Sequence, residues 1–255
     1  MQAEIALYVI IFIYGIVFGS FLNVLIYRIP KKENFTVERS HCMKCGQQIK
    51  WYDLIPVFSY IILRGRCRSC GEKISIQYPL VEAVNGTFYV LIFLYNGISA
   101  LSLLYCFVFS IFLTISVIDF RTYEIPAGLN AAIMVLAVVR LIFEPEWMAD
   151  RLTGFISVSG FMLICLVLGR KLKGVDAFGG GDIKLMAASG LLMGVKQVVL
   201  GFILGCIFGA VIHSIRMKVS GEDNVLAFGP YLCAGLFVTM LFGDMIIDWY
   251  LGMIM

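Results

Sequence analysis

Long apolar runs alternate with shorter polar stretches along the chain, and this pattern predicts several membrane-spanning helices. A helix that crosses the hydrocarbon core of a bilayer needs about 20 mostly apolar residues. Seven segments approach or reach that length, at about 4–27, 79–96, 100–119, 127–143, 152–169, 196–216 and 229–252. An eighth, shorter apolar segment follows Asp182. The pattern therefore predicts an all-α, polytopic membrane protein with about eight transmembrane helices.

The polar stretch 28–78 interrupts this pattern and is long for a connection between helices. Loops of such length usually have a function or a structure of their own. We therefore expect a first transmembrane helix over 1–27, a cytosolic loop over 28–78 and a transmembrane helical domain over 79–255. The chain begins MQAE, without a basic region or a small-residue cleavage site, so the first apolar segment is predicted to be a retained helix.

The composition agrees with the membrane prediction. Hydrophobic residues make up 60% of the chain and the mean hydropathy is +0.92, both above the values typical of water-soluble domains. The net charge is +3. We attribute this charge to orientation in the membrane, and it gives no indication of a nucleic-acid partner.

The distribution of Lys and Arg predicts the orientation, because these residues are retained on the cytoplasmic side during insertion. An amino terminus outside the cell places the loop 28–78 inside. Seventeen basic residues then lie inside, ten of them in the loop. The three on the opposite side are Arg140, Arg151 and Lys196.

The loop contains two C-x2-C pairs separated by 21 residues, a spacing close to that of four-thiolate zinc sites. Its cysteines are Cys42, Cys45, Cys67 and Cys70. Gly46 and Gly71 each follow the second cysteine of a pair and would ease the tight backbone of a zinc knuckle. Two disulfides or four free thiols are the alternatives. A cytosolic loop is kept reduced, which favours zinc over disulfides.

Asp119 and Asp182 are the carboxylates that carry the functional prediction. Ionisable groups in membrane segments are costly and suggest function. The predicted topology places both at the cytoplasmic surface, where two carboxylates can act as an aspartic protease pair that shares one proton. Gly179, Gly180 and Gly181 precede Asp182 and would allow an extended substrate to approach the backbone closely. For each aspartate alone, a helix-end charge is the structural alternative.

Several motifs, in order and spacing, resemble those of type 4 prepilin peptidases. They are GSFLNVLIYRIP (19–30), WYDLIPVFSYIILRGRCRSCG (51–71), SIQYPLVEAVNG (75–86), DFRTYEIP (119–126), FGGGDIKLMAASG (178–190) and FGPYL (228–232). The resemblance implies that Asp119 and Asp182 are catalytic and that the enzyme lies in the bacterial inner membrane, where it cleaves the basic leader of prepilins or pseudopilins. It also implies zinc in the cysteine loop and methylation of the new amino terminus by S-adenosylmethionine. Ala127 departs from the family's IPD motif at a position that is not catalytic.

Two further sites stay open at this stage. Glu82 either contacts the substrate or is a simple charge at a helix start. The chain has no glycine-rich Rossmann loop, so S-adenosylmethionine is expected to bind at the membrane surface, between GSFLN and the zinc loop. The alternative functions are a transporter with a proton relay through Asp119 and Asp182, or a metal-sensing scaffold, which leaves the glycine-aspartate motif unexplained.

Overall fold

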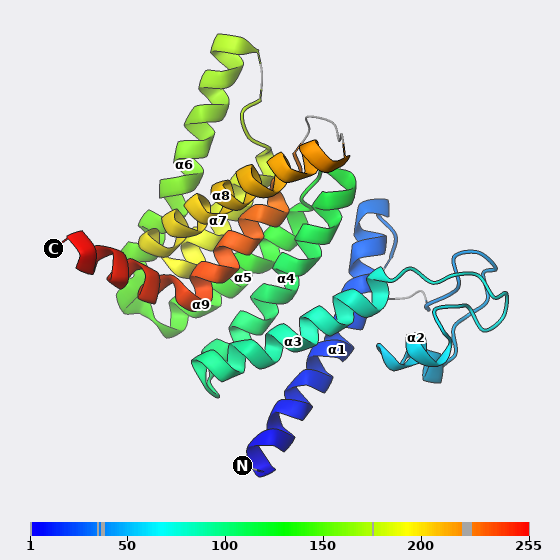
Figure 1. Cartoon of the computed structure of the whole chain (residues 1–255). Helices are drawn as coiled ribbons and strands as arrows, with labels where there is room; N and C mark the ends of the chain where they lie inside the picture. The colour runs from blue at the N-terminus through cyan, green and yellow to red at the C-terminus, as the bar shows by residue number, and fades with distance from the viewer. Residues whose placement is uncertain (1, 35, 37–38, 175, 221–225, 255) are drawn as a thin grey trace. The chain divides into compact units, whose positions relative to one another are not determined.

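The computed structural model describes residues 2–34, 36, 39–174, 176–220 and 226–254 (Figure 1). Its contacts divide the chain into two compact units, Met1–Thr114 and Ile115–Met255. The described residues form helices and turns, and their only β-pairings are two isolated bridges in the cysteine loop. The all-α prediction is therefore confirmed.

The first unit is built on a close crossing of α1 (Gln2–Lys31) and α3 (Gln77–Asn96). A Cβ atom added to Gly15 would lie 2.6 Å from the Cα of Gly86, and one added to Gly19 would lie 2.7 Å from the Cα of Glu82. Small residues of this kind let membrane helices approach backbone to backbone. Asn85 reinforces the crossing, because its side-chain amide donates a 2.8 Å hydrogen bond to the carbonyl of Gly15.

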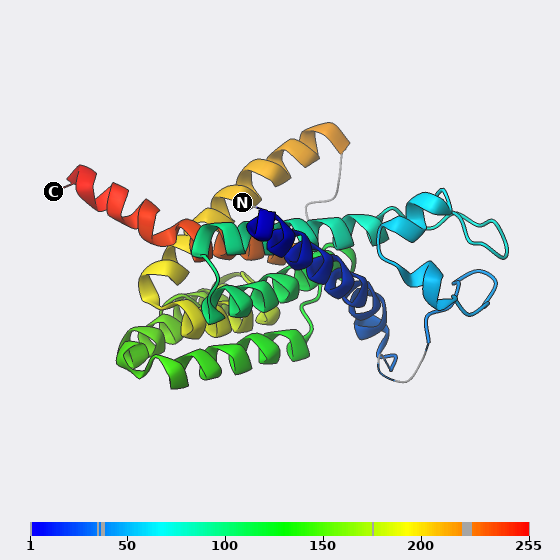
Figure 2. The same ribbon diagram turned by 90° about the horizontal axis from the view of Figure 1, so that it is seen from below.

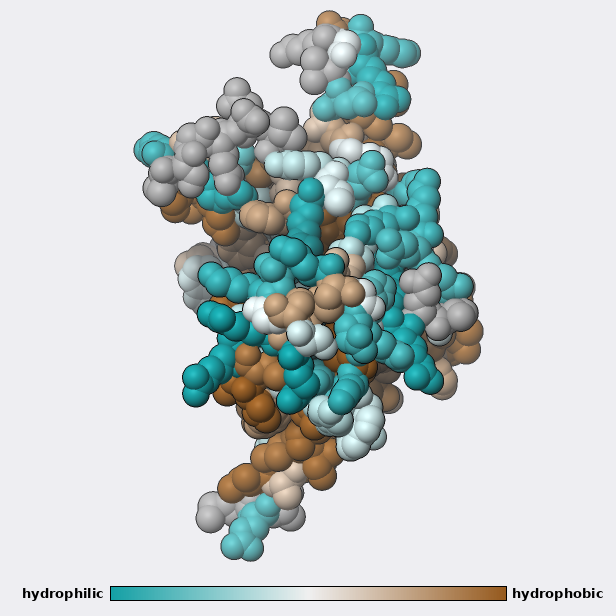
Figure 3. All heavy atoms as spheres, turned by 90° about the vertical axis from the view of Figure 1, so that its right-hand side faces the viewer, coloured by the Kyte–Doolittle hydropathy of each residue, from teal (hydrophilic) through white to brown (hydrophobic). Residues whose placement is uncertain are grey.

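The cysteine loop connects α1 to α3 and contains a short 3₁₀ helix, Trp51–Leu54, and the short helix α2 (Phe58–Ile62). It extends beyond the carboxyl end of α1 and the amino end of α3 in both ribbon views (Figures 1 and 2). Hydrophilic residues cover most of the face that this loop presents, whereas the shaft of α1 is hydrophobic (Figure 3). This contrast is the one expected of a polar loop attached to a membrane helix pair.

The second unit contains the end of α4 (Ala100–Thr122) and the helices that follow it. These are α5 (Ala127–Phe143), α6 (Met148–Lys173), α7 (Gly180–Met193), α8 (Val195–Ser220) and α9 (Gly229–Ile254), with a 3₁₀ turn at Pro145–Trp147. Helix α7 contacts α5, α6, α8 and α9, and every residue from Leu185 to Met193 is buried. A helix buried on all sides explains why α7 is apolar without a polar face.

All eight predicted helices are present, and six of them are long and apolar enough to cross a membrane. The other two are α5, with 17 residues, and α7, with 14. At 1.5 Å per residue, α7 is about 21 Å long, short of the ~30 Å hydrocarbon core. Length and composition thus support six spans among the described residues rather than eight.

Candidate active site and metal centre

Asp119 and Asp182 both belong to the second unit and are brought close together there. Asp119 lies three residues before the carboxyl end of α4 and is 5% exposed. Asp182 lies in the first turn of α7 and is half-buried. The two carboxylates are near enough to repel each other electrostatically. No hydrogen bond joins them in the described part of the chain.

The start of α9 holds the carboxylate of Asp119. The backbone N–H of Gly229 donates a 2.9 Å hydrogen bond to Oδ2 of Asp119. The first N–H groups of a helix have no partner within the helix, so they are available to an acceptor of this kind. A Cβ atom on Gly229 would lie 2.8 Å from the same oxygen and 3.1 Å from Cδ1 of Ile125. Only glycine fits this contact without displacing Asp119.

The carboxylate of Asp182 turns back toward the start of its own helix. Gly179 is the N-cap of α7, and its backbone hydrogen-bonds to the Asp182 side chain. An acidic side chain three residues after the N-cap commonly reaches back in this way. A Cβ atom on Gly179 would lie 2.8 Å from Oδ2 of Asp182. The start of α7 therefore orients the Asp182 carboxylate, as expected if Asp182 were only a charge at a helix end. A carboxylate oriented in this way can also be catalytic.

The three glycines before Asp182 differ in their surroundings. A Cβ atom on Gly181 would lie 2.8 Å from the Cβ of Ile125, so this glycine permits tight packing against the segment after α4. Gly180 is exposed and has nothing within 4 Å of an added Cβ. Of the three, Gly180 is the one that faces open space.

Asn130 adds a polar group that the sequence analysis did not identify. Its side-chain amide donates a 3.2 Å hydrogen bond to the carbonyl of Gly181. Its Oδ1 is buried and has no hydrogen-bond partner among the described residues. Buried polar atoms in proteins are nearly always hydrogen-bonded, so this acceptor close to the Asp182 turn is available to a hydrogen-bond donor.

The four loop cysteines form one cluster in the first unit. Their sulfur atoms all lie within 4.8 Å of one another, and Sγ of Cys42 is 3.9 Å from Sγ of Cys70. Zn–S bonds of ~2.3 Å in a tetrahedron place sulfur atoms about 3.8 Å apart. All eight cysteines of the chain are free thiols. The cluster therefore fits a tetrahedral zinc ion, and disulfides are not formed.

The two C-x2-C turns have the same backbone hydrogen bonds. In the first, the N–H of Cys42 donates to the carbonyl of Gln47, and the N–H of Gly46 donates to that of Cys42. The second repeats this pattern between Cys67 and Glu72 and between Gly71 and Cys67. Gly46 and Gly71 adopt φ values of 68° and 73°, in the left-handed region that favours glycine. The expected role of these glycines is confirmed.

Backbone donors and ion pairs support the cluster. Backbone hydrogen bonds from Cys45 and Lys44 lower the pKa of the Cys42 thiol to about 6. A backbone hydrogen bond from Glu72 lowers the pKa of the Cys70 thiol, whereas burial and hydrogen bonds to the other thiols raise it. The raising effects are larger together, and the pKa is about 11. Lys44 also forms a 3.0 Å ion pair with Glu72, which links the two turns. Zinc would replace the protons that the remaining thiols hold.

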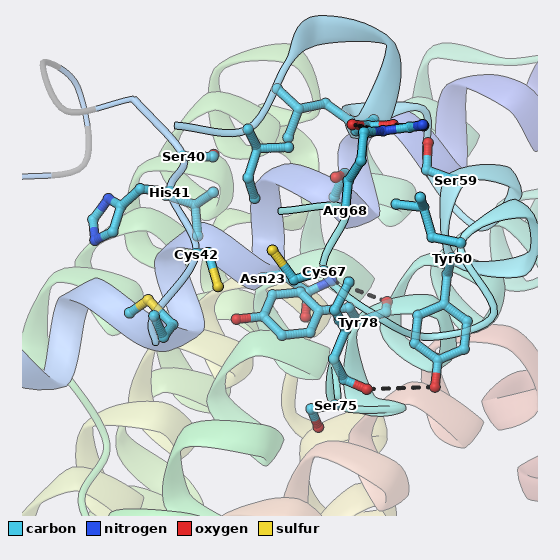
Figure 4. A pocket seen from close by; sticks show the side chains of 18 of the residues that line it. Asn23, Ser40, His41, Cys42, Ser59, Tyr60, Cys67, Arg68, Ser75 and Tyr78 are labelled. Carbon is cyan, nitrogen blue, oxygen red and sulfur yellow. Dashed lines mark hydrogen bonds and ion pairs between the residues drawn. The ribbon is translucent and has the colours of Figure 1, made fainter. Parts of the chain in front are cut away.

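A cavity of about 550 Å³ lies beside the cluster, and the described residues that line it all belong to the first unit. Its walls come from the end of α1, the cysteine loop and the start of α3. The sulfur atoms of Cys42 and Cys67 point toward the same space, and Tyr60, Tyr78 and Asn23 line it further along (Figure 4). The volume lies within the 300–1,000 Å³ range of small-molecule sites.

Glu82 forms part of the cavity wall, at the start of α3, and is only 6% exposed. Its carboxylate accepts a 2.7 Å hydrogen bond from the backbone N–H of Val57 and another from the hydroxyl of Ser20. Val57 has a φ of 61°, which is rare for a β-branched residue. The hydrogen bond from Val57 to Glu82 thus holds this part of the loop against α3. Glu82 belongs to the first unit, whereas the two aspartates belong to the second.

Comparison with known proteins identifies both halves of the chain. Residues 13–96 match the bacterial peptidase A24 N-terminal domain, and residues 106–214 match the type IV leader peptidase family. A prepilin leader peptidase/N-methyltransferase of Vibrio cholerae serotype O1 is 36% identical, over 84% of this chain and 88% of its own length. A protein of the same name from Bacillus subtilis is 32% identical, over 96% and 98% respectively. No solved structure matches. The chain belongs to the type IV leader peptidase family.

Proposed function

We propose that this protein is a membrane aspartic endopeptidase that removes the short basic leader of prepilins or pseudopilins and then methylates the new amino terminus. Two relatives, which match 84% and 96% of this chain, carry the name prepilin leader peptidase/N-methyltransferase. The observation that carries the peptidase assignment is the pairing of Asp119 and Asp182 in one unit. A transporter with a proton relay is not favoured, because the family of the chain is a peptidase family.

In this proposal the two carboxylates have different roles in hydrolysis of the peptide bond. One takes a proton from the attacking water while the other, protonated, donates a hydrogen bond to the carbonyl of the scissile peptide. Two carboxylates in close proximity cannot both ionise readily, so a single shared proton is the favoured state. The hydrogen bond from Gly229 holds one oxygen of Asp119, which fixes the direction in which the other oxygen points.

The peptide substrate is proposed to approach at Gly180. This residue is exposed and has open space where a side chain would lie. Asn130 supports the same placement, since its buried Oδ1 can accept a hydrogen bond from a substrate N–H. Gly179 and Gly181 would then contribute by keeping Asp182 and Ile125 in place.

The proposed orientation puts the amino terminus outside and the cysteine loop in the cytoplasm. The charge bias supports it. Two of the three basic residues on the opposite side, Arg140 and Arg151, share an ion pair with Glu144, which offsets one of their two positive charges. Zinc is proposed to bind the four cysteines as a structural ion that holds the loop in its folded form.

The mass of the amino terminus of a co-expressed prepilin tests this function. The proposal predicts a product shortened by its leader and heavier than the cleaved peptide by one methyl group. A prepilin that keeps its leader, in cells where the chain is inserted in the membrane and holds zinc, would overturn the peptidase assignment. A cleaved but unmethylated product would support the peptidase assignment and overturn the methyltransferase assignment.

A further inference from the structure

We propose that the cavity of the first unit binds S-adenosylmethionine, with the Glu82 carboxylate facing the sulfonium of this molecule. The inference rests on the methyltransferase part of the proposed function, and it assigns that activity a place and a recognition group. Among the described residues, those that line the cavity all belong to Met1–Thr114, whereas Asp119 and Asp182 belong to Ile115–Met255. Methyl-donor binding and peptide cleavage are therefore assigned to different units of the chain.

The charge of Glu82 is the first argument. The side chain is buried, and no Lys or Arg among the described residues forms an ion pair with it. Its two known partners, the N–H of Val57 and the hydroxyl of Ser20, are neutral. A carboxylate buried without a cation is costly. A ligand with a positive charge would offset that cost, and S-adenosylmethionine carries a sulfonium and an ammonium group.

Asn23 provides the second argument, independent of charge. Its side-chain amide donates to the carbonyls of Gly19 and Tyr78, at 3.4 and 3.1 Å. Its Oδ1 has no partner although the residue is only 3% exposed. Asn23 lines the cavity (Figure 4). The unpartnered oxygen can accept a hydrogen bond from a hydroxyl or amino group of the ligand.

The remaining walls suit a nucleoside. Tyr60 and Tyr78 line the cavity with aromatic side chains (Figure 4). Tyr27 lines it as well, with Nζ of Lys31 over its ring. An adenine ring can stack on an aromatic ring of this kind. Volume, aromatic walls, an unpartnered acceptor and an unpaired buried carboxylate thus fit the shape and charge of S-adenosylmethionine.

When bound, this molecule would supply its methyl group to the amine of the cleaved substrate. A nitrogen–carbon bond forms as the sulfur–carbon bond breaks, the sulfur keeps the electron pair and becomes a neutral thioether, and the nitrogen releases a proton. The sulfonium charge is therefore lost in the reaction. A carboxylate beside it favours the charged donor over the neutral product, S-adenosylhomocysteine.

Calorimetry on the purified full chain in detergent, with S-adenosylmethionine and S-adenosylhomocysteine as separate ligands, tests the proposal. Wild-type protein should bind the charged donor more tightly. Glu82→Gln keeps an acceptor for Val57 and removes the charge. It should weaken donor binding about 10-fold to 100-fold, as expected for the lost attraction between a carboxylate and a sulfonium in a partly buried site, and should change product binding much less. Asp248→Asn removes an exposed carboxylate elsewhere and should change neither affinity.

Asn23→Ala gives a second, charge-independent variant. It should weaken both ligands by a similar factor of about 3 to 10, as expected for one neutral hydrogen bond. Zinc content and thermal unfolding report whether each variant is folded. Wild-type affinities in both folded variants would overturn the proposal. It would also be overturned if Glu82→Gln bound S-adenosylmethionine normally but bound a peptide amine, the methyl acceptor, more weakly. A wild-type chain that methylates prepilin while both variants bind the donor normally would leave the proposed function intact and place the donor site elsewhere.

Discussion

The backbone N–H of Gly229 donates a 2.9 Å hydrogen bond to the carboxylate of Asp119, 110 positions earlier in the chain. This bond joins the start of α9 to the end of α4. It fixes one oxygen of an aspartate that is proposed to act on the substrate. A displacement of a catalytic group by about 1 Å can lower the reaction rate by about 100-fold.

Gly229→Ala is therefore expected to impair cleavage. Its Cβ atom would lie 2.8 Å from Oδ2 of Asp119 and force the carboxylate to move. We predict about a 100-fold fall in the rate of leader cleavage, measured with purified enzyme and a prepilin peptide.

Gly252→Ala is the matched control, since it lies on the same helix and has nothing within 4 Å of an added Cβ. Normal cleavage by folded Gly229→Ala protein would show that the position of Asp119 is not critical.

Gly180→Ala tests the approach of the substrate. The free space around Gly180 means that alanine should leave the thermal unfolding temperature unchanged or slightly raised, since alanine favours helices. The KM for the prepilin peptide should rise several-fold. Gly128, at the start of α5, also has nothing within 4 Å of an added Cβ. A KM that rose equally in Gly180→Ala and Gly128→Ala would show that the effect is not specific to the proposed approach.

Loss of zinc should separate the two activities. Cys70→Ser should release the metal and loosen the loop, because metal binding and folding are coupled in such sites. Since Cys42 and Cys67 line the cavity, methylation should fall more than cleavage. Zinc content, protease resistance of the loop and the two product masses report these effects.

His41→Ala is the control for this test. His41 adjoins Cys42, but it is not a member of the four-sulfur cluster, and its ring lies away from Cys67 in Figure 4. This variant should keep the metal. Equal loss of methylation and cleavage in Cys70→Ser protein would indicate one shared site.

Local patterns in the sequence predicted most of the fold. Apolar runs indicated all eight helices, and the C-x2-C-G spacing indicated the two turns in which Gly46 and Gly71 take positive φ. The count of eight spans stays a prediction, because apolar composition does not distinguish a membrane span from a short helix such as α7 that is buried by its neighbours.

Contacts between distant residues account for what the sequence did not reveal. Nothing near Gly229 in the sequence indicates that it faces Asp119, and nothing near Asn130 indicates that it reaches Gly181. The packing of Ile125 against Gly181 is a further example. Glu82 was recognised as a candidate, but its burial beside Val57 in a cavity follows only from the folded loop.

The central claim is that Asp119 and Asp182 act as one catalytic pair. Because an amide cannot take up the proton of the attacking water, Asp119→Asn and Asp182→Asn should each reduce cleavage by about 10²–10⁴-fold or more. The double variant should be little worse than either single variant, since residues that act as a unit are not additive. Asp244→Asn and Asp248→Asn should be nearly silent.

The most direct measurement is the amino-terminal mass of prepilin co-expressed with each single variant, in membranes where the variant is inserted and holds zinc. The account predicts that the full leader is retained with Asp119→Asn and with Asp182→Asn, and removed with Asp248→Asn. Substantial removal of the leader by either Asp119→Asn or Asp182→Asn would contradict the two-aspartate mechanism.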